Sequence, residues 1–356
     1  MKEKEKLLFK ELCGFKKESF DRSLLDYAPP NVLGHLFFNR MQGAAYDRLK
    51  QNGLCGYVNR EFRNSLKSAY EQNIIKNQSF MKCVVDVAGI LKDSGCRTAM
   101  LKGSVLCSQY PPGYRTSNDI DLLVFPNDVT KIGNLLLKAG YRQGNIRNGE
   151  FVPAKRNEII ESKMMRGETV PYIKEVNMPG FRYSEVDINF SLDFKNGETD
   201  ILDEILKNAV VVNKCGIMIP TLSKEDLFID LCAHLYQEAA TLPWVEMKRD
   251  MTLYKYCDIY MLLCEMSDED IEKVFLRAEQ LKLEKICAYA VSETLGLFEI
   301  AKKKLIDTVK KILAEDPDFV LRVYSPREKK YLIYQTKDTM ERFFMNDRKK
   351  DLKEVI

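Results

Sequence analysis

Two aspartates separated by one apolar residue are the feature of this sequence with the clearest chemical meaning. Asp119 and Asp121 belong to the run Asn-Asp-Ile-Asp-Leu-Leu-Val-Phe at 118–125. In a strand, residues two apart point to the same side, so the two carboxylates share a face. Such carboxylates repel each other, and a divalent cation such as Mg²⁺ is the simplest compensation. Two solvated aspartates at a strand end are the alternative, but the apolar run Leu122–Phe125 is typical of a central strand and favours the metal site.

A glycine and a serine precede this pair at a point where an expected strand passes into an expected helix. Gly103 and Ser104 directly follow the run Arg97–Leu101 and its neighbour Lys102. Glycine lets a backbone approach a ligand closely, and the N–H groups at a helix start attract phosphate. A Gly-Ser pair alone usually marks only a turn. Because the next strand carries the two carboxylates, the sequence predicts a phosphate-binding turn beside a metal site.

Two basic residues near these motifs could neutralise phosphate charge. Lys102 precedes the glycine, and Arg115 lies three residues before Asn118, in the loop between the turn and the aspartates. Both residue types bind phosphate through charge-assisted hydrogen bonds. A solvated lysine at a strand end and a solvated arginine in a turn are the alternatives, and the position of Arg115 makes it the stronger candidate.

The elements that must position these residues follow from changes in the hydrophobic period along the chain. The pattern is helical from Lys4 to Asp93, and the last helix of this region is expected over Arg60–Asp93. Helices are also expected over Ser104–Tyr110 and Pro126–Ala139, and a loose polar stretch follows the second. Short runs typical of strands occur at Arg97–Leu101, Ile120–Phe125, Tyr172–Asn177, Glu185–Phe190 and Val210–Ile219.

After Pro220 the chain returns to a helical pattern. Ser223 and Ser267 each stand three residues before an acid, which is the capping-box pattern of a helix start. The tail from Pro326 mixes pairs of basic residues with acids, and it is expected to form a solvated helix rather than an RNA-binding arm.

Composition restricts the class of protein. The chain has 356 residues, of which 45% are hydrophobic and 30% charged. At about 150 residues per domain this length predicts two to three folded units, and the apolar fraction excludes intrinsic disorder. The predicted fold class is α+β, with a small mixed-sheet core at 94–220 flanked by helical regions at 1–93 and 221–356. The net charge of +3 is too balanced for a dedicated nucleic-acid binder.

The sequence indicates neither a membrane segment nor a zinc site. It contains no apolar run long enough to span a bilayer, and its N-terminal stretch has no apolar core of signal-peptide length. The 10 cysteines never approach the Cys-x-x-Cys spacing of a zinc site. Most of them lie in apolar stretches, where cysteine is usually a small buried side chain. We therefore expect a reduced, cytoplasmic protein with no membrane partner and no zinc.

These motifs resemble those of the bacterial uncharacterised nucleotidyltransferases of the DNA polymerase β superfamily, over about residues 28–263. The residues that carry the resemblance are Leu101-Lys102-Gly103-Ser104, Tyr110, Gly113, Arg115, Asp119 to Val124 and Gly140-Tyr141. The superfamily signature ends with a third aspartate on a later strand, and here that residue is Asp187, with Val186 and Ile188 on the opposite face. Two features depart from the pattern: fourteen residues separate Ser104 from Asp119, and Asn189 stands where relatives often have histidine.

The resemblance implies a nucleotidyltransferase that moves a nucleoside monophosphate, expected to be AMP, from a nucleoside triphosphate to a hydroxyl acceptor and releases pyrophosphate. Asp119, Asp121 and Asp187 would be the catalytic residues and would hold two Mg²⁺ ions. The donor triphosphate would be bound by Gly103, Ser104, Lys102 and Arg115. The acceptor is open: a small molecule, a protein side chain or an RNA end would each serve.

A catalytically silent nucleotide-binding or regulatory module on the same fold is the alternative. The presence of all three carboxylates favours the enzyme, since a decayed site would be expected to lose at least one. His234 and Asp258 lie on expected helices that follow the core, within the part of the chain that resembles the family. Packing or hydrogen bonding explains each of them as well as a role in the site does. The preferred base, the oligomeric state and a role as a toxin are not encoded in any readable pattern.

Overall fold

The chain is organised as two compact units. The computed structural model describes residues 1–14, 20–26, 29–92, 94–192, 199–214 and 216–354. One unit, here called the sheet unit, comprises residues 71–227, and the other, here called the helical unit, comprises 1–70 with 228–356. The boundaries between them fall within helices α4 (Arg60–Lys92) and α9 (Lys224–Ala239). The division into three regions along the sequence stays a prediction.

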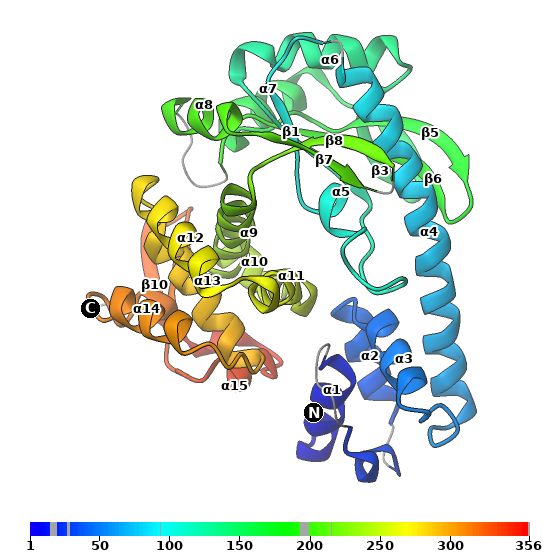
Figure 1. Ribbon diagram of the computed structural model, residues 1–356, viewed down its shortest axis with the longest axis vertical. Coiled ribbons are helices and arrows are strands. Elements are labelled where there is room, and N and C mark those ends of the chain that lie inside the picture. The colour runs from blue at the N-terminus through cyan, green and yellow to red at the C-terminus, as the bar shows by residue number, and fades with distance from the viewer. Residues whose placement is uncertain (15–19, 27–28, 93, 193–198, 215, 355–356) are drawn as a thin grey trace. The chain divides into compact units, whose positions relative to one another are not determined.

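An eight-stranded mixed sheet forms the centre of the sheet unit (Figure 1). Its strands lie side by side in the order β4-β3-β5-β6-β2-β1-β8-β7. The pairs β2–β6 and β1–β8 are parallel, whereas β1 and β2 run antiparallel. The strands are β1 (Thr98–Met100), β2 (Asp119–Val124), β3 (Arg142–Arg147), β4 (Glu150–Pro153), β5 (Tyr172–Met178), β6 (Phe181–Asn189), β7 (Val210–Lys214) and β8 (Ile217–Thr221).

One face of this sheet packs against helices α4 and α6 (Val129–Lys138). The strand alternation directs Ile120 and Leu122 of β2 and Val186 and Ile188 of β6 to this face, and all four are buried. They pack in one cluster with helical side chains, among them Phe80, Val84, Val87, Ile132 and Leu136. The alternate residues of β2 and β6 must therefore face the other side of the sheet.

The strands and helices predicted for the core are present, with two differences of detail. The run Val210–Ile219 is a hairpin of β7 and β8, not one strand, because Gly216 with φ of 82° supplies a turn. Helix α5 covers only Gly103–Leu106, shorter than expected. The remaining helical elements of this unit are η2 (Pro126–Asp128), α7 (Arg156–Arg166) and α8 (Thr199–Lys207).

A hairpin occupies the polar stretch that was expected to be loose. Strands β3 and β4 pair antiparallel around Asn148 and Gly149, both of which have positive φ, 53° and 80°. Asn-Gly with this conformation is the favoured two-residue hairpin turn. The hydrophobic pattern missed these strands because their side chains are largely exposed or half-buried.

The helical unit is built mainly from helices of the two chain ends. The capping box predicted at Ser267 is confirmed, because Ser267 and Asp270 cap each other reciprocally. At Ser223, the Asp226 amide donates to Ser223 Oγ, which is the N-cap half of the predicted pattern. The helices besides α9 are α1 (Glu3–Cys13), α2 (Pro30–Phe38), α3 (Gln42–Gln51), α10 (Leu242–Glu246), α11 (Leu253–Glu265), α12 (Asp268–Gln280), α13 (Glu284–Leu297), α14 (Lys303–Leu313) and α15 (Thr339–Phe343), with 3₁₀ turns η1 (Arg22–Asp26), η3 (Phe319–Leu321) and η4 (Arg348–Asp351).

The tail from Pro326 is not a solvated helix, so that prediction was wrong. It contributes β10 (Lys330–Tyr334) and β11 (Leu352–Glu354) to a three-stranded antiparallel sheet with β9 (Arg322–Ser325). Within β10 only Tyr334 is buried and Tyr331 is exposed, while the other three residues are half-buried, so no clear period marks this strand in the sequence.

Two buried ion pairs hold this tail within the helical unit. The Arg342 guanidinium donates to both carboxylate oxygens of Glu293 on α13, at 2.6 and 2.7 Å. Arg348 contacts both carboxylate oxygens of Asp250, each at 2.6 Å. All four residues are buried.

Two residues of the sequence predictions, Asp93 and Cys215, lie outside the described part of the chain. The nine cysteines within it are all free thiols. Among the described residues, no helix combines the length and the apolar character needed to cross a membrane.

Candidate active site

Acidic side chains gather on the sheet face that lies opposite α4 and α6. Strands β2 and β6 pair in parallel, with Asp119 opposite Glu185 and Asp121 opposite Asp187. Neighbouring strands lie about 5 Å apart, and residues in register point to the same face. The structure thus brings together the three aspartates predicted from sequence and adds Glu185 as a fourth carboxylate.

Burial and neighbouring acids raise the pKa values of Glu185 and Asp187. Burial, and then the charges of Asp119 and Asp121, raise the pKa of Glu185 to about 7. Burial raises the pKa of Asp187 well above its usual value, and the carboxylates of Asp121, Glu185, Asp119 and Glu168 raise it further. A cation placed among these groups would therefore be strongly stabilised.

Glu168 and Glu185 were not singled out by sequence reasoning. Glu185 did carry a signal, because Glu185, Asp187 and Asn189 alternate along one strand and must share its face. Glu168 carried none, since it precedes β5 in a stretch without a readable period. Its position depends on pairing between distant parts of the chain.

Lys102 provides a positive charge at this site. Its Nζ lies 3.2 Å from Asp121 Oδ1, and both side chains are largely buried. The backbone of Lys102 has φ of 44°, an unusual conformation for a residue with a side chain, and the preceding Leu101 amide donates to the Asp121 carbonyl at 2.9 Å. The tight turn thus fixes Lys102 beside Asp121, where its ammonium partly compensates the acids.

We expect Lys102→Met to destabilise the metal-free protein. The substitution leaves Asp121 without its ammonium among other carboxylates, which costs about 1–3 kcal/mol. Thermal unfolding with EDTA measures the loss, and Lys163→Met, at an exposed position of α7, is the control. Added Mg²⁺ should reduce the difference in unfolding temperature between Lys102→Met and the wild-type protein. Equal unfolding temperatures of the two proteins in EDTA would show that Lys102 is not the counter-ion of Asp121.

The glycine-serine turn lies directly against the strand that carries the aspartates. A Cβ on Gly103 would stand 2.3 Å from Ser117 Oγ, so only glycine fits this close approach. Ser117 in turn donates a hydrogen bond from its Oγ to Asp119 Oδ1 at 3.0 Å. Gly103 therefore lets the chain approach closely enough for Ser117 to orient Asp119.

Ser104 is fully buried, and its hydroxyl has no hydrogen-bond partner in the described part of the chain. A buried hydroxyl without a partner costs about 1–3 kcal/mol. Because α5 has only four residues, the binding capacity of this turn rests on the serine hydroxyl and the glycine approach rather than on a helix end.

Gly103→Ala should disturb the site and lower stability together. The new methyl group must displace Ser117, which releases Asp119 and costs about 1–3 kcal/mol, as overpacking does. Gly89→Ala is the control, because its Cβ would meet nothing within 4 Å on the exposed side of α4, and it should stabilise the helix by about 1 kcal/mol. Equal unfolding free energies of Gly103→Ala and wild type would contradict the close approach.

The donor set of the face suits Mg²⁺, which takes carboxylate oxygens together with substrate phosphates. In the described residues, however, no group of three or more His, Cys, Asp or Glu side chains stands close enough to hold a metal ion. The Lys102 ammonium contacts one of the two carboxylate oxygens of Asp121. The residue types present fit the ion in chemistry.

The remaining predicted residues occupy different surroundings. Arg115 is buried, and its guanidinium donates to the Thr116 carbonyl, so its phosphate role stays a prediction. His234 and Asp258 belong to the helical unit. His234 Nε2 lies 3.3 Å from Glu238 Oε1, and Asp258 is buried on α11; their roles stay open.

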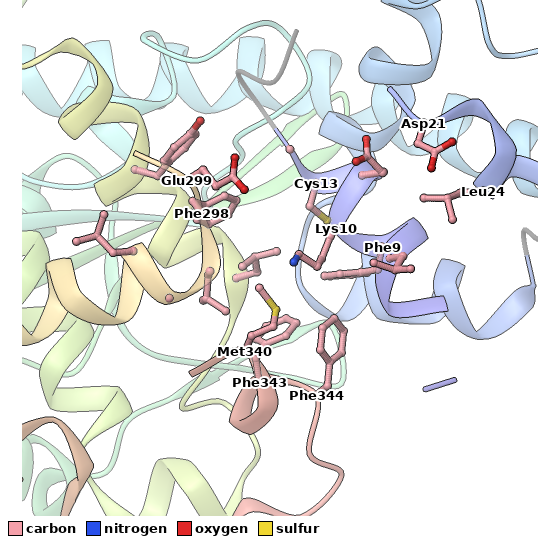
Figure 2. Close-up of a pocket in the computed structure, with 18 residues that line it drawn as sticks. Phe9, Lys10, Cys13, Asp21, Leu24, Phe298, Glu299, Met340, Phe343 and Phe344 are labelled. Atoms are coloured by element: carbon pink, nitrogen blue, oxygen red, sulfur yellow. The ribbon is translucent and has the colours of Figure 1, made fainter. Parts of the chain in front are cut away.

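A cavity of about 580 Å³ lies within the helical unit (Figure 2). It is lined by aromatic rings, including those of Phe9, Phe298 and Phe343, and the labelled acids Asp21 and Glu299 lie apart from each other. This volume is typical of small-molecule pockets. The cavity lacks the converging carboxylates that metal and phosphate chemistry needs, so the acidic sheet face is the candidate active site.

The sheet unit combines a mixed sheet, helices on one of its faces and in-register acids of two parallel strands on the other. Residues 30–294, more than half of the chain, match the family described as "uncharacterised nucleotidyltransferase". The protein therefore belongs to this family of nucleotidyltransferases.

Two solved structures are similar to this chain at low sequence identity. One is an antigenic nucleotidyltransferase-like protein from Paracoccidioides brasiliensis, at 12% identity and a TM-score of 0.38, covering 68% of this chain and 91% of the other. The second is the antibiotic-resistance factor ANT(2'')-Ia, at 10% identity and a TM-score of 0.32, covering 58% of this chain and 96% of the other. A search of curated proteins gives no match.

Proposed function

We propose that this protein transfers a nucleoside monophosphate, AMP by preference, from a nucleoside triphosphate to a hydroxyl group of an acceptor, with release of pyrophosphate. The observation that carries the proposal is the register of β2 and β6, which sets Asp121 beside Asp187 and Asp119 beside Glu185. Membership of the nucleotidyltransferase family agrees with it. We place the reaction in the cytoplasm, as the free cysteines of the described residues suggest.

Asp119, Asp121 and Asp187 would hold two Mg²⁺ ions on this face. Bound Mg²⁺ supplies charge neutralisation at the phosphate oxygens of the donor and at the reacting oxygens. The Ser104 hydroxyl, buried and without a partner in the described residues, would donate to a phosphate oxygen. Gly103 would permit the close approach of the triphosphate.

Lys102 and Arg115 would complete the phosphate contacts. With Asp121 as a metal ligand, the Lys102 ammonium would exchange its contact with that carboxylate for a phosphate oxygen. Arg115 lies four residues before Asp119, on the loop between the Gly103-Ser104 turn and the aspartates. Its guanidinium would bind the same phosphates.

The transfer is a displacement at the α-phosphorus. The acceptor oxygen forms a bond to the α-phosphorus while the bond from that phosphorus to the bridging oxygen breaks, and pyrophosphate leaves with the electron pair. Asp187 accepts the hydroxyl proton of the acceptor, which its place at the centre of the acidic face supports.

Incubation with Mg²⁺ and each of four α-labelled nucleoside triphosphates tests the proposal. We expect release of pyrophosphate and transfer of label, fastest with ATP, to a hydroxyl acceptor or to the protein itself. Asp119→Ala should abolish both, whereas Asp86→Ala, at an exposed position of α4, should leave them unchanged. Equal activity of Asp119→Ala and wild type would refute the proposal.

A silent nucleotide-binding module is the second candidate, because no group of three or more acids, histidines or cysteines in the described residues stands close enough to hold a metal ion. For such a module we expect Mg²⁺-dependent nucleotide binding that is lost in Asp119→Ala. No nucleotide should then give pyrophosphate release. Calorimetric titration with a nucleotide, run beside the turnover assay, separates the two candidates.

A further inference from the structure

A buried amide extends the acidic face beyond Asp187. Asn189 follows Asp187 by two residues on β6, so its side chain points to the same face. It is only 9% exposed, and its Nδ2 has no hydrogen-bond partner in the described residues. A buried donor of this kind costs stability until an acceptor atom pairs with it. Its position points to a ligand oxygen beside Asp187.

Glu168 stands opposite this amide. The short segment before β5 forms an antiparallel bridge with the end of β6, in which Glu168 is paired with Asn189. Hydrogen bonds from the Thr169 amide to the Ile188 carbonyl, at 2.9 Å, and from the Phe190 amide to the Gly167 carbonyl, at 2.8 Å, fix this register. Directly opposed residues of an antiparallel pair present their side chains on the same face. Glu168 and Asn189 therefore lie together beside Asp187.

The strand order determines on which side of the aspartates Glu168 and Asn189 lie. In the sheet, β5, β6, β2 and β1 are consecutive neighbours. The Gly103-Ser104 turn follows β1, at one side of the aspartates, whereas Glu168 lies on the other side, where it pairs with Asn189 at the end of β6. An in-line displacement needs the leaving pyrophosphate and the attacking oxygen on opposite sides of the phosphorus. With the triphosphate at the turn, the acceptor comes from the side of Glu168.

Charge limits the chemistry of that acceptor. Asp119, Asp121 and Asp187 would be neutralised by the metal ions, so the carboxylate that gives the acceptor side its negative charge is Glu168, which lies opposite Asn189. A polyanion such as RNA would be repelled there, whereas an ammonium group near the reacting hydroxyl would be attracted.

Resting on the proposed function, we propose that Glu168 and Asn189 form the acceptor subsite and select a small hydroxyl compound that carries a positive charge. The Glu168 carboxylate pairs with the ammonium group, and the Asn189 Nδ2 donates to an oxygen of the acceptor. The acceptor hydroxyl oxygen then bonds to the α-phosphorus, its proton passes to Asp187, and pyrophosphate leaves.

A matched set of alcohols tests this selection. Choline carries a hydroxyl and a permanent positive charge, 3,3-dimethylbutan-1-ol has the same shape without the charge, and a short oligoribonucleotide offers a 3′-hydroxyl on a polyanion. With Mg²⁺ and labelled ATP, we expect the wild-type protein to transfer label to choline about tenfold faster than to the neutral alcohol, and least to the oligoribonucleotide.

Two variants assign the preference to its residues. Glu168→Gln should reduce the choline preference to about twofold or less, and Asn189→Leu should raise the KM of both alcohols. Nucleotide affinity, measured by titration with a non-hydrolysable ATP analogue, should survive in both. Glu161→Gln, on the exposed side of α7, is the control and should keep the full preference.

The outcomes separate this inference from the proposed function. If the wild-type protein binds Mg²⁺-nucleotide but prefers the neutral alcohol or the oligoribonucleotide, transfers nothing to choline, or keeps its preference in Glu168→Gln, the subsite is refuted while the nucleotide site stands. If the wild-type protein binds no nucleotide with Mg²⁺, the proposed function itself fails.

Discussion

Asp187→Asn should remove catalysis and at the same time stabilise the metal-free protein. Asp187 lies opposite Asp121 in the sheet, and its charge is opposed by burial and by four neighbouring carboxylates. Loss of one metal ligand and proton acceptor should lower Mg²⁺-dependent pyrophosphate release on the order of 10³-fold or more. Loss of one repelled charge should raise the free energy of unfolding in EDTA by about 1–2 kcal/mol.

The opposite signs of the two effects make this prediction informative. A purely structural aspartate would lose stability on substitution, and a solvated one would change neither quantity. Asp86→Asn, at an exposed site on α4 of the same unit, is the matched control and should change neither activity nor stability. Destabilisation by Asp187→Asn, or full activity, would contradict a carboxylate site that waits for a cation.

Arg342→Met should produce the largest loss of stability in the helical unit. The guanidinium is 1% exposed and binds both oxygens of Glu293, which is 3% exposed, and it also donates to the carbonyls of Thr336 and Lys337. Without it, the Glu293 carboxylate is buried with its charge uncompensated. Removal of one partner from a buried pair costs about 3–5 kcal/mol. Chemical denaturation followed by circular dichroism measures the loss.

Two comparisons show whether the buried charge is the cause. The double variant Glu293→Leu with Arg342→Met removes both charges, so it should be more stable than Arg342→Met alone. Arg182→Met breaks exposed ion pairs with Glu150 and Glu175 and should cost much less stability than Arg342→Met. A double variant less stable than Arg342→Met would show that packing of the arginine, and not charge, carries the effect.

The strands that carry the site could be predicted because burial imposes a period on them. Ile120 and Leu122 on β2, and Val186 and Ile188 on β6, face one helical layer, and this fixes the direction of the aspartates between them. The parallel pairing of β2 with β6 could not be read from either strand. It depends on the strand order, which is set by packing between segments more than sixty residues apart.

The features that were missed share a physical cause. Strands β3 and β4 expose much of both faces, so no hydrophobic period marks them. The sequence feature that indicates the hairpin is Asn148-Gly149 at its turn. The tail strand β10 shows no alternation of buried and exposed residues. Glu168 reaches the site through a single backbone bridge to Asn189, and neither residue type nor spacing encodes such a bridge.

The central claim is that Asp119, Asp121 and Asp187 hold metal ions together with a nucleoside triphosphate. Its most direct measurement is a Mn²⁺ titration, followed by electron paramagnetic resonance, in the presence of a non-hydrolysable ATP analogue. We predict that the wild-type protein binds two Mn²⁺ ions per chain with the nucleotide, and that Asp187→Asn loses at least one of them while Asp86→Asn keeps both. Identical Mn²⁺ binding by Asp187→Asn and the wild-type protein would contradict the claim.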